Sequence, residues 1–267
     1  IVGPSGCGKS TLFYVLMRLL YPLKGNIFIQ GKNYDDLAEK SIREHFAVAF
    51  QEHHIFNLSI RDNFKMLYEN ITDEEIYKSL ENVYLLDFVK QVGLDYIVGN
   101  DGNKLSGGQK HRLQLAICLA KQKDIILLDE PTAGLDPKER VRFRNVISSL
   151  GKNRMVLLST HIVSDIDYIA DRILIMKNGE LIQEGTEKEI ADKVEGCVWK
   201  CIVSEKEAGQ ITSSFIVSNM RSSGENVELR IVSERQPVAG AENVESTLED
   251  AYLYHTQITG GEKNATL

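Results

Sequence analysis

Residues 3–10, which read GPSGCGKS, restrict the fold of this chain more than any other segment. They fit the pattern G-x-x-x-x-G-K-[ST], in which glycines let backbone N–H groups turn inward and bind phosphate oxygens at the start of a helix. Ile1-Val2 are typical of the end of a buried strand, and the apolar run 11–20 predicts the helix that follows. In this pattern Lys9 pairs with the β and γ phosphates, and the Ser10 hydroxyl holds Mg²⁺. The alternative is a glycine-rich turn that matches by chance.

Strand and helix signals alternate over residues 1–193. Short apolar runs predict buried strands at 46–50, 125–128, 155–158 and 173–176. Cap patterns predict helix starts at Thr72-x-x-Glu75, at Thr186-x-x-Glu189 and at Asp136-Pro137-x-Glu139, the last with a reciprocal glutamate. Asn178-Gly179 predicts a hairpin turn. This alternation predicts an α/β fold with a mainly parallel sheet.

The pattern changes after about residue 193. Segments 198–203 and 227–232 alternate like half-exposed strands around a polar stretch, and Ser246-x-x-Glu249 predicts the cap of a final helix. Residues 194–267 are therefore predicted to form a small α+β extension. Because the chain begins with what resembles the end of a strand, we also expect that its domain lacks its first strands.

Composition narrows the class of protein only weakly. The net charge of −7 argues against a nucleic-acid partner, since no overall basic field attracts phosphate backbones. No stretch approaches the roughly 18 apolar residues of a membrane-spanning helix. The four cysteines contain no C-x-x-C pair, so neither a disulfide framework nor a zinc site is predicted, and we expect a reducing cytoplasm.

An acidic pair, Asp129-Glu130, ends the apolar run 125–128. Asp129 is suited to coordinate Mg²⁺ at the tip of the strand. Glu130, the next residue, is placed to take a proton from an attacking water. Alone, such a pair is commonly a solvated strand end, but beside a phosphate-binding loop it predicts catalysis.

A second anion-binding helix start follows Leu105, in Ser106-Gly107-Gly108-Gln109. One ATP does not need two such helix starts from one chain. A head-to-tail dimer, in which Ser106-Gly107-Gly108 closes over the γ-phosphate bound by the partner, accounts for both. Lys110-His111-Arg112 is interpreted as a solvated first turn or a contact with a neighbour.

Together these motifs resemble those of the ABC ATPases, over residues 1 to about 190. Gln51 is similar to the glutamine that contacts Mg²⁺ and the attacking water in that family. Gly134-Leu135-Asp136 resembles the D-loop, which communicates across the dimer, and His161 resembles the histidine that contacts the γ-phosphate.

The resemblance implies a P-loop NTPase (RecA-like) core with a helical subdomain at about 52–104, and an ATPase that uses ATP and Mg²⁺. It implies a second cassette and a transmembrane permease as partners, at the inner face of the cell membrane. The adenine-stacking residue of the family is expected upstream of residue 1. The implied catalytic residues are Glu130, His161 and Gln51, and the implied Mg²⁺ ligands are Ser10, Gln51 and Asp129. The implied ATP-binding residues are Gly3, Pro4, Ser5, Gly6, Cys7, Gly8, Lys9, Ser10, Thr11, Ser106, Gly107, Gly108, Gln109 and Asp136.

Different parts of the chain resemble two different subtypes of ABC transporter. Residues 98–102 are similar to a segment of exporters with fused membrane domains, although Asn100 stands where those exporters usually carry Glu. From Pro131 onward the chain resembles the separate ATPase subunits of ABC-2-type transporters, which is the arrangement we expect. The alternatives are the fused exporter, an ABC-family ATPase that transports nothing, and a regulator that binds nucleotide without hydrolysing it.

Overall fold

The computed structural model describes residues 1–50, 55–121, 123–167 and 169–257. These residues form two compact units, Ile1–Gly8 with His161–Leu267 and Lys9–Thr160. They contain no helix with the length and apolar character needed to span a membrane. The units do not follow the division at residue 193, which stays a prediction.

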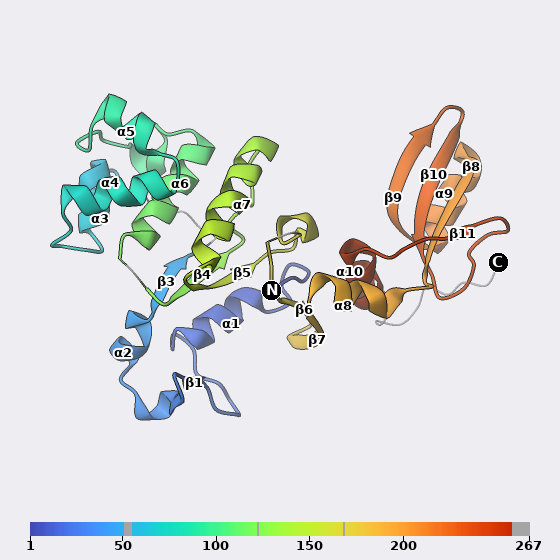
Figure 1. The fold of residues 1–267 in the computed structure, drawn as a ribbon, viewed down its shortest axis with the longest axis horizontal. Coiled ribbons are helices and arrows are strands. Elements are labelled where there is room, and N and C mark those ends of the chain that lie inside the picture. Colours follow the sequence, from blue (N-terminus) through green and yellow to red (C-terminus); the bar gives the residue numbers. More distant parts are fainter. Residues whose placement is uncertain (51–54, 122, 168, 258–267) are drawn as a thin grey trace. The chain divides into compact units, whose positions relative to one another are not determined.

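The Lys9–Thr160 unit is built on a parallel sheet with the order β3-β4-β5, formed by Phe46–Ala49, Ile125–Asp129 and Met155–Ser159 (Figure 1). Ile126, Leu127 and Leu128 of β4 are fully buried, as expected for a strand covered on both faces. The sheet contacts α1 (Lys9–Leu16), α6 (Gly107–Leu119) and α7 (Pro137–Gly151). This confirms the predicted α/β fold with a parallel sheet.

Between β3 and β4 the described chain is helical. It contains α3 (Ile60–Lys65), α4 (Asp73–Asn82), α5 (Leu86–Val92), the short η2 (Asn100–Gly102) and α6. The predicted capping box at Thr72 and Glu75 is confirmed. Between α1 and β3 lie β1 (Phe28–Ile29), β2 (Lys32–Asn33), η1 (Tyr34–Asp36) and α2 (Glu39–Glu44).

In the other unit, β6 (Ile173–Lys177) and β7 (Glu180–Gly185) form the predicted hairpin. Asn178 and Gly179 both have positive φ, of 51° and 83°, as a two-residue hairpin turn requires. Val2 pairs in parallel with Ile175 of β6 and is fully buried, as its predicted strand character requires. The short η3 (Val163–Asp165) precedes this hairpin, and α8 (Glu187–Ala191) and η4 (Asp192–Val194) follow it.

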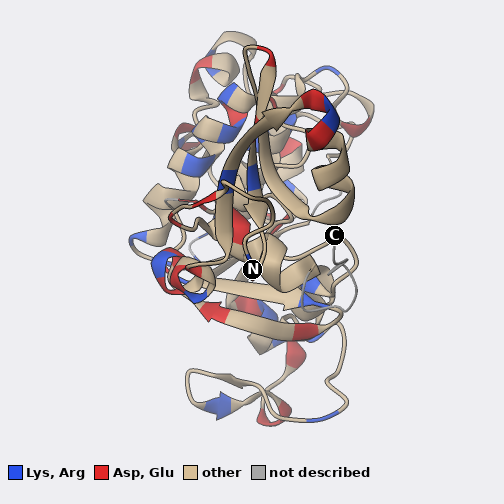
Figure 2. Cartoon of the chain, turned by 90° about the vertical axis from the view of Figure 1, so that its right-hand side faces the viewer, with Lys and Arg blue, Asp and Glu red and all other residues tan. Residues whose placement is uncertain are grey.

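The last part of this unit is an antiparallel sheet with the order β11-β8-β10-β9. Its strands are β8 (Val198–Ser204), β9 (Ile216–Ser223), β10 (Asn226–Val232) and β11 (Glu242–Asn243), and α9 (Glu205–Ser214) and α10 (Leu248–Gln257) complete it. Apolar side chains of α9 pack on β8 and β10 in a small core around Leu229 and Ile231. The sequence did not predict α9 or β9. Basic and acidic residues are interspersed along the ribbon in the view of Figure 2.

The predicted cap of the final helix is wrong by one residue. Thr247, not Ser246, accepts a hydrogen bond from the amide of Asp250, and the Asp250 carboxylate accepts from the Thr247 amide at 2.9 Å. Asp250 is fully buried and also accepts hydrogen bonds from Arg230 and Ser218. Burial alone raises the pKa of Asp250, but these hydrogen bonds outweigh it and hold the pKa below its usual value.

A depressed pKa stabilises the fold above the unfolded-state pKa, and this contribution is lost as pH falls through the folded-state pKa. We therefore expect Asp250→Asn to destabilise the chain at pH 7 by about 3 kcal/mol, because Arg230 loses its buried partner. The variant should also lose less stability than the wild type on acidification below about pH 4. Urea denaturation at a series of pH values measures both effects, and Glu249→Gln, at an exposed neighbouring carboxylate, is the control. Identical pH profiles for wild type and Asp250→Asn would contradict this.

Candidate active site

The turn over residues 3–8 is set by close contact with β6. A Cβ added at Gly3 would lie 2.4 Å from the Met176 carbonyl oxygen and 2.6 Å from Cys7 Sγ, so only glycine fits there. The Cys7 amide donates to the Pro4 carbonyl, and the Cys7 carbonyl accepts from Gly179 in the β6–β7 turn. Through these two hydrogen bonds Cys7 both closes the turn and joins it to the β6–β7 turn.

Its outer residues are the accessible ones. Ser5 and Gly6 are exposed, and Gly6 and Gly8 have φ values of 78° and 104° that glycine adopts without strain. Lys9, the next residue, begins α1, with Ser10 half-buried and Thr11 exposed behind it. A turn of this kind that leads into a helix N-terminus presents backbone N–H groups suited to an anion.

Lys9 lies at the carboxyl end of β4. Its ammonium group forms an ion pair with the Glu130 carboxylate, Nζ to Oε1 at 3.2 Å, with exposed fractions of only 5% and 9% for the two side chains. The two residues that the sequence assigned to phosphate binding and to catalysis are thus brought together in one buried cluster.

Glu130 is held in a rare backbone conformation. Its φ is 48°, in the left-handed region that few residues other than glycine adopt, and its amide donates to the carbonyl oxygen and the hydroxyl oxygen of Ser159 at 3.0 and 3.2 Å. Backbone strain of this type is of order 1–3 kcal/mol and is concentrated at functional sites.

Asp129 is 3% exposed, and its carboxylate accepts a hydrogen bond from the fully buried Ser159 hydroxyl. Ser159 was missed as a site residue. A signal was available: both strands have four apolar residues before a polar one, so Asp129 and Ser159 end in the same register, as the parallel pairing shows. The carboxylate of Asp129 and the hydroxyl of Ser10 are oxygen donors of the kind that Mg²⁺ prefers, so the donor set fits this ion.

The other predicted residues lie on separate elements. Ser106 caps α6 in a reciprocal box with Gln109: its hydroxyl oxygen accepts from the Gln109 amide at 3.2 Å, and the Gln109 side chain accepts from the Ser106 amide at 2.8 Å. Ser106 and Gly107 are exposed, and the amides of a first helical turn have no acceptor within the helix. Asp136 is exposed and caps α7, accepting from the Glu139 amide.

His161 is exposed and lies just after β5, in the unit that also contains Gly3–Gly8. Gln51 lies outside the described residues.

Two details of the sequence interpretation were wrong. The Glu139 carboxylate contacts Arg112 and Arg142 rather than the amide of its own cap residue, so the box at Asp136 is not reciprocal. Arg112 is 13% exposed in that ion pair, so for this residue a solvated first turn is wrong, while the alternative for residues 110–112, a contact with a neighbour, stays a prediction.

Comparison with known proteins identifies the family. Residues 1–133 match the family model described as ABC transporter. Over 195 residues the chain is 36% identical to the beta-(1→2)glucan export ATP-binding/permease protein NdvA of Bartonella bacilliformis and to that of Agrobacterium vitis, an alignment that covers 72% of the chain and 33% of each relative. The chain is also similar to a bacterial Atm1-family ABC exporter solved with ATP bound, with a TM-score of 0.67 and 30% identity over 72% of the chain and 34% of that structure's chain.

The chain belongs to the ABC transporter family and contains its ATP-binding domain. It spans about a third of the length of the relatives that it matches.

We expect Ser159→Ala to destabilise the chain by about 1–3 kcal/mol, because the buried Asp129 carboxylate loses a hydrogen bond. Denaturant unfolding measures this, and Ser222→Ala, the same change at an exposed serine, is the control. Equal stability of Ser159→Ala and wild type would show that the hydrogen bond contributes nothing.

Proposed function

We propose that the chain hydrolyses ATP and thereby powers export through a membrane permease. The buried cluster of Lys9, Asp129 and Glu130 at the end of β4 is the observation that carries this proposal. It combines a cation for phosphate, a carboxylate for Mg²⁺ and a second carboxylate for proton transfer.

In the proposed reaction the amides of residues 3–8 and the Lys9 ammonium bind the phosphates of ATP. Ser10 and Asp129 would hold Mg²⁺, together with Gln51, and the bound ion supplies charge neutralisation on the phosphate oxygens. Glu130 accepts a proton from water as the water oxygen bonds to the γ-phosphorus. The bond from that phosphorus to the bridging oxygen breaks, which yields ADP and phosphate. His161 orients the γ-phosphate and the water.

The Lys9–Glu130 ion pair implies an exchange of partners in this scheme. When Lys9 pairs with phosphate, its hold on Glu130 weakens, and the carboxylate becomes available to water. Nucleotide binding and activation of the base are therefore coupled through one lysine.

The second half of the proposed site comes from a partner cassette. The exposed Ser106-Gly107 start of α6 would close over the nucleotide of the partner, and the exposed Asp136 at the start of α7 would lie in the same interface. In a head-to-tail dimer this creates two sites, each with residues from both chains.

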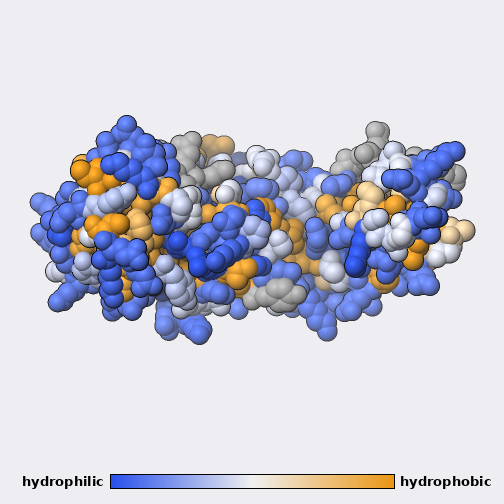
Figure 3. Space-filling model, turned by 90° about the horizontal axis from the view of Figure 1, so that it is seen from above, coloured by the Kyte–Doolittle hydropathy of each residue, from blue (hydrophilic) through white to orange (hydrophobic). Residues whose placement is uncertain are grey.

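The helical segment before α6 is the proposed contact with the permease. It exposes large apolar side chains, including Phe56, Met66, Leu67 and Ile97. In Figure 3 hydrophobic residues are visible among polar ones on the left, where this segment lies. Exposed apolar groups of this kind are common at protein interfaces. The domain would thus lie at the inner face of the membrane through its partner.

The relatives are named as export proteins with ATP-binding and permease parts, which favours a transporter over an ABC-family ATPase of another kind. Their fused form also favours the fused arrangement over the separate subunit, and the neighbouring coding sequence tests this. Because the permease selects the cargo, the glucan named for those relatives is not assigned to this chain.

A mixture of two inactive variants tests the shared site. Glu130→Gln removes the proton acceptor of the chain's own site, while Ser106→Arg blocks closure over the partner's nucleotide. A mixed dimer has one site with both defects and one with neither. If one intact site suffices, mixing should restore part of the steady-state phosphate release.

Heterodimer formation is confirmed by differently tagged chains, and Ser222→Arg, at an exposed position of β9, is the control for the added charge. Confirmed heterodimers without restored activity would count against a shared site with independent turnover.

A further inference from the structure

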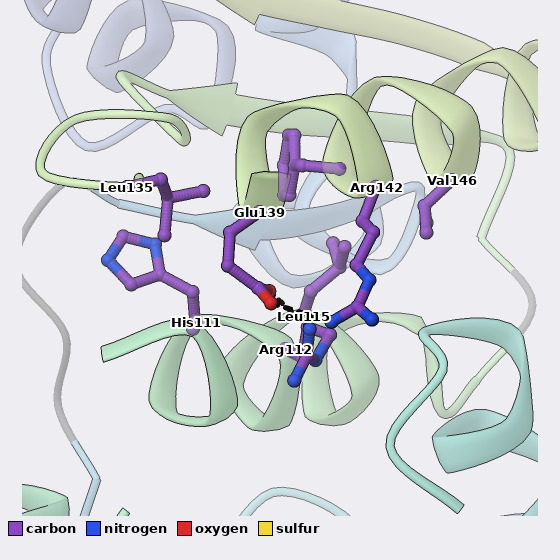
Figure 4. Close-up of a pocket in the computed structure, with 9 residues that line it drawn as sticks. His111, Arg112, Leu115, Leu135, Glu139, Arg142 and Val146 are labelled. Atoms are coloured by element: carbon purple, nitrogen blue, oxygen red, sulfur yellow. Dashed lines mark hydrogen bonds and ion pairs between the residues drawn. The ribbon is translucent and has the colours of Figure 1, made fainter. Parts of the chain in front are cut away.

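The α7 residue Glu139 contacts the N-terminal turn of α6 (Figure 4). A Cβ added at Gly108 would lie 2.7 Å from the Cδ and Oε2 atoms of Glu139 and 2.8 Å from its Cγ. Gly108 thus allows the Glu139 side chain to lie directly against α6, in addition to any contact that Gly108 makes with a nucleotide.

Two guanidinium groups fix the Glu139 carboxylate. Arg112 of α6 donates through Nη1 to Oε2, and Arg142 of α7 donates through Nη1 to Oε1 at 2.7 Å. Glu139 and Arg112 are 14% and 13% exposed, whereas Arg142 is 44% exposed. Of the two pairs, the one between the helices is therefore the less exposed, and solvent screens it less.

Removing one partner of such a pair leaves the other charge largely buried and without compensation. Within the described residues, the buried Nε of Arg112 already has no hydrogen-bond partner. The Arg112 side chain therefore depends on Glu139 for its charge compensation. The matched pair within α7, Glu139 with Arg142, cannot connect the two helices.

Asp136 connects this contact to the D-loop. Its carboxylate accepts a hydrogen bond from the Glu139 amide at 2.9 Å and so fixes the first turn of α7. The Glu139 side chain leaves that same turn and reaches α6. A continuous set of contacts therefore runs from Asp136 through Glu139 to Arg112 and Gly108.

We propose that Glu139 is a positioning residue that ties the signature segment Ser106-Gly107-Gly108 to the D-loop helix α7. The two segments then approach a partner's nucleotide as one rigid body. This inference rests on the proposed function, since both segments serve the partner in a head-to-tail dimer. Glu139 acts through Arg112 and Gly108 and needs no contact with ATP.

Glu139→Gln removes the charge of the side chain and keeps its shape, so it tests the ion pair between α7 and α6 directly. In a Glu130→Gln background, which slows turnover, we expect Glu139→Gln to raise the chain concentration needed for ATP-dependent dimerisation by about tenfold. ATP affinity of the chain's own phosphate-binding loop should not change. Arg112→Gln should have the same effect, and the double variant should be no worse than either single one, because both remove one interaction.

Arg142→Gln is the matched control, since it removes the other ion pair of Glu139 within α7 and leaves the link to α6. Dimerisation is measured by analytical ultracentrifugation, and amide hydrogen exchange of residues 106–109 is measured on the monomer. Exchange there should become faster in Glu139→Gln and Arg112→Gln but not in Arg142→Gln.

The proposal would be overturned if hydrogen exchange of residues 106–109 were unchanged in Glu139→Gln and Arg112→Gln. It would also be overturned if exchange became faster while ATP-dependent dimerisation stayed the same. A lower melting temperature without weaker dimerisation would also overturn it, because it would make Glu139 a purely structural residue. If the Glu130→Gln chain itself forms no ATP-dependent dimer, the proposal of a shared site is contradicted instead. Hydrogen exchange on the monomer then still decides whether Glu139 holds α6 against α7.

Discussion

The buried ion pair between Lys9 and Glu130 is the interaction on which the rest of the site depends. It joins the first residue of α1 to the first residue after β4, so it fixes the start of the helix against the end of the sheet. Loss of one partner of a buried pair destabilises a protein by about 3–5 kcal/mol, because the remaining charge is left without compensation. In the proposed reaction a phosphate group replaces Glu130 as the partner of this lysine, so that nucleotide binding would exchange one anion for another.

The parallel sheet supplies the positions for this exchange. Because β4 and β5 run in the same direction and in register, Asp129 and Ser159 end side by side, and Glu130 follows them into the loop. The two hydrogen bonds from the Glu130 amide to Ser159 hold the strained backbone that points the chain away from the sheet. Strand register thus places the Asp129 carboxylate beside the Ser159 hydroxyl, and the ion pair with Glu130 brings Lys9 to the same end of β4.

The sequence predicted the parts of this arrangement that depend on local pattern. The apolar runs of β4 and β5, the boxes at Thr72 and Thr186 and the hairpin at Asn178 follow from short-range spacing, and the structure has them. It missed α9, because Ser, Thr and Gly dilute its apolar face, and β9, because that strand is largely exposed and polar. The Thr247 cap was missed for a similar reason, since Ser246-x-x-Glu249 and Thr247-x-x-Asp250 are equally good patterns one residue apart.

Contacts between distant segments could not be predicted from spacing. Arg112 and Glu139 are each typical of solvated helix faces, and only the packing of α6 against α7 makes their pairing a largely buried one. The same holds for Lys9 with Glu130, whose motifs predicted separate roles but not a direct ion pair. The sequence motifs therefore identified the residues with functional side chains, but they did not predict which of these side chains form ion pairs with one another.

Equilibrium binding of ATP in the presence of Mg²⁺, measured by calorimetry, tests most directly whether the Lys9 site is the nucleotide site. We predict that Lys9→Ala lowers the affinity for ATP at least about tenfold, since a charge-assisted contact with phosphate is lost. Lys32→Ala, at an exposed lysine of β2, should bind ATP like the wild type. Wild-type affinity in a folded Lys9→Ala variant would contradict the account.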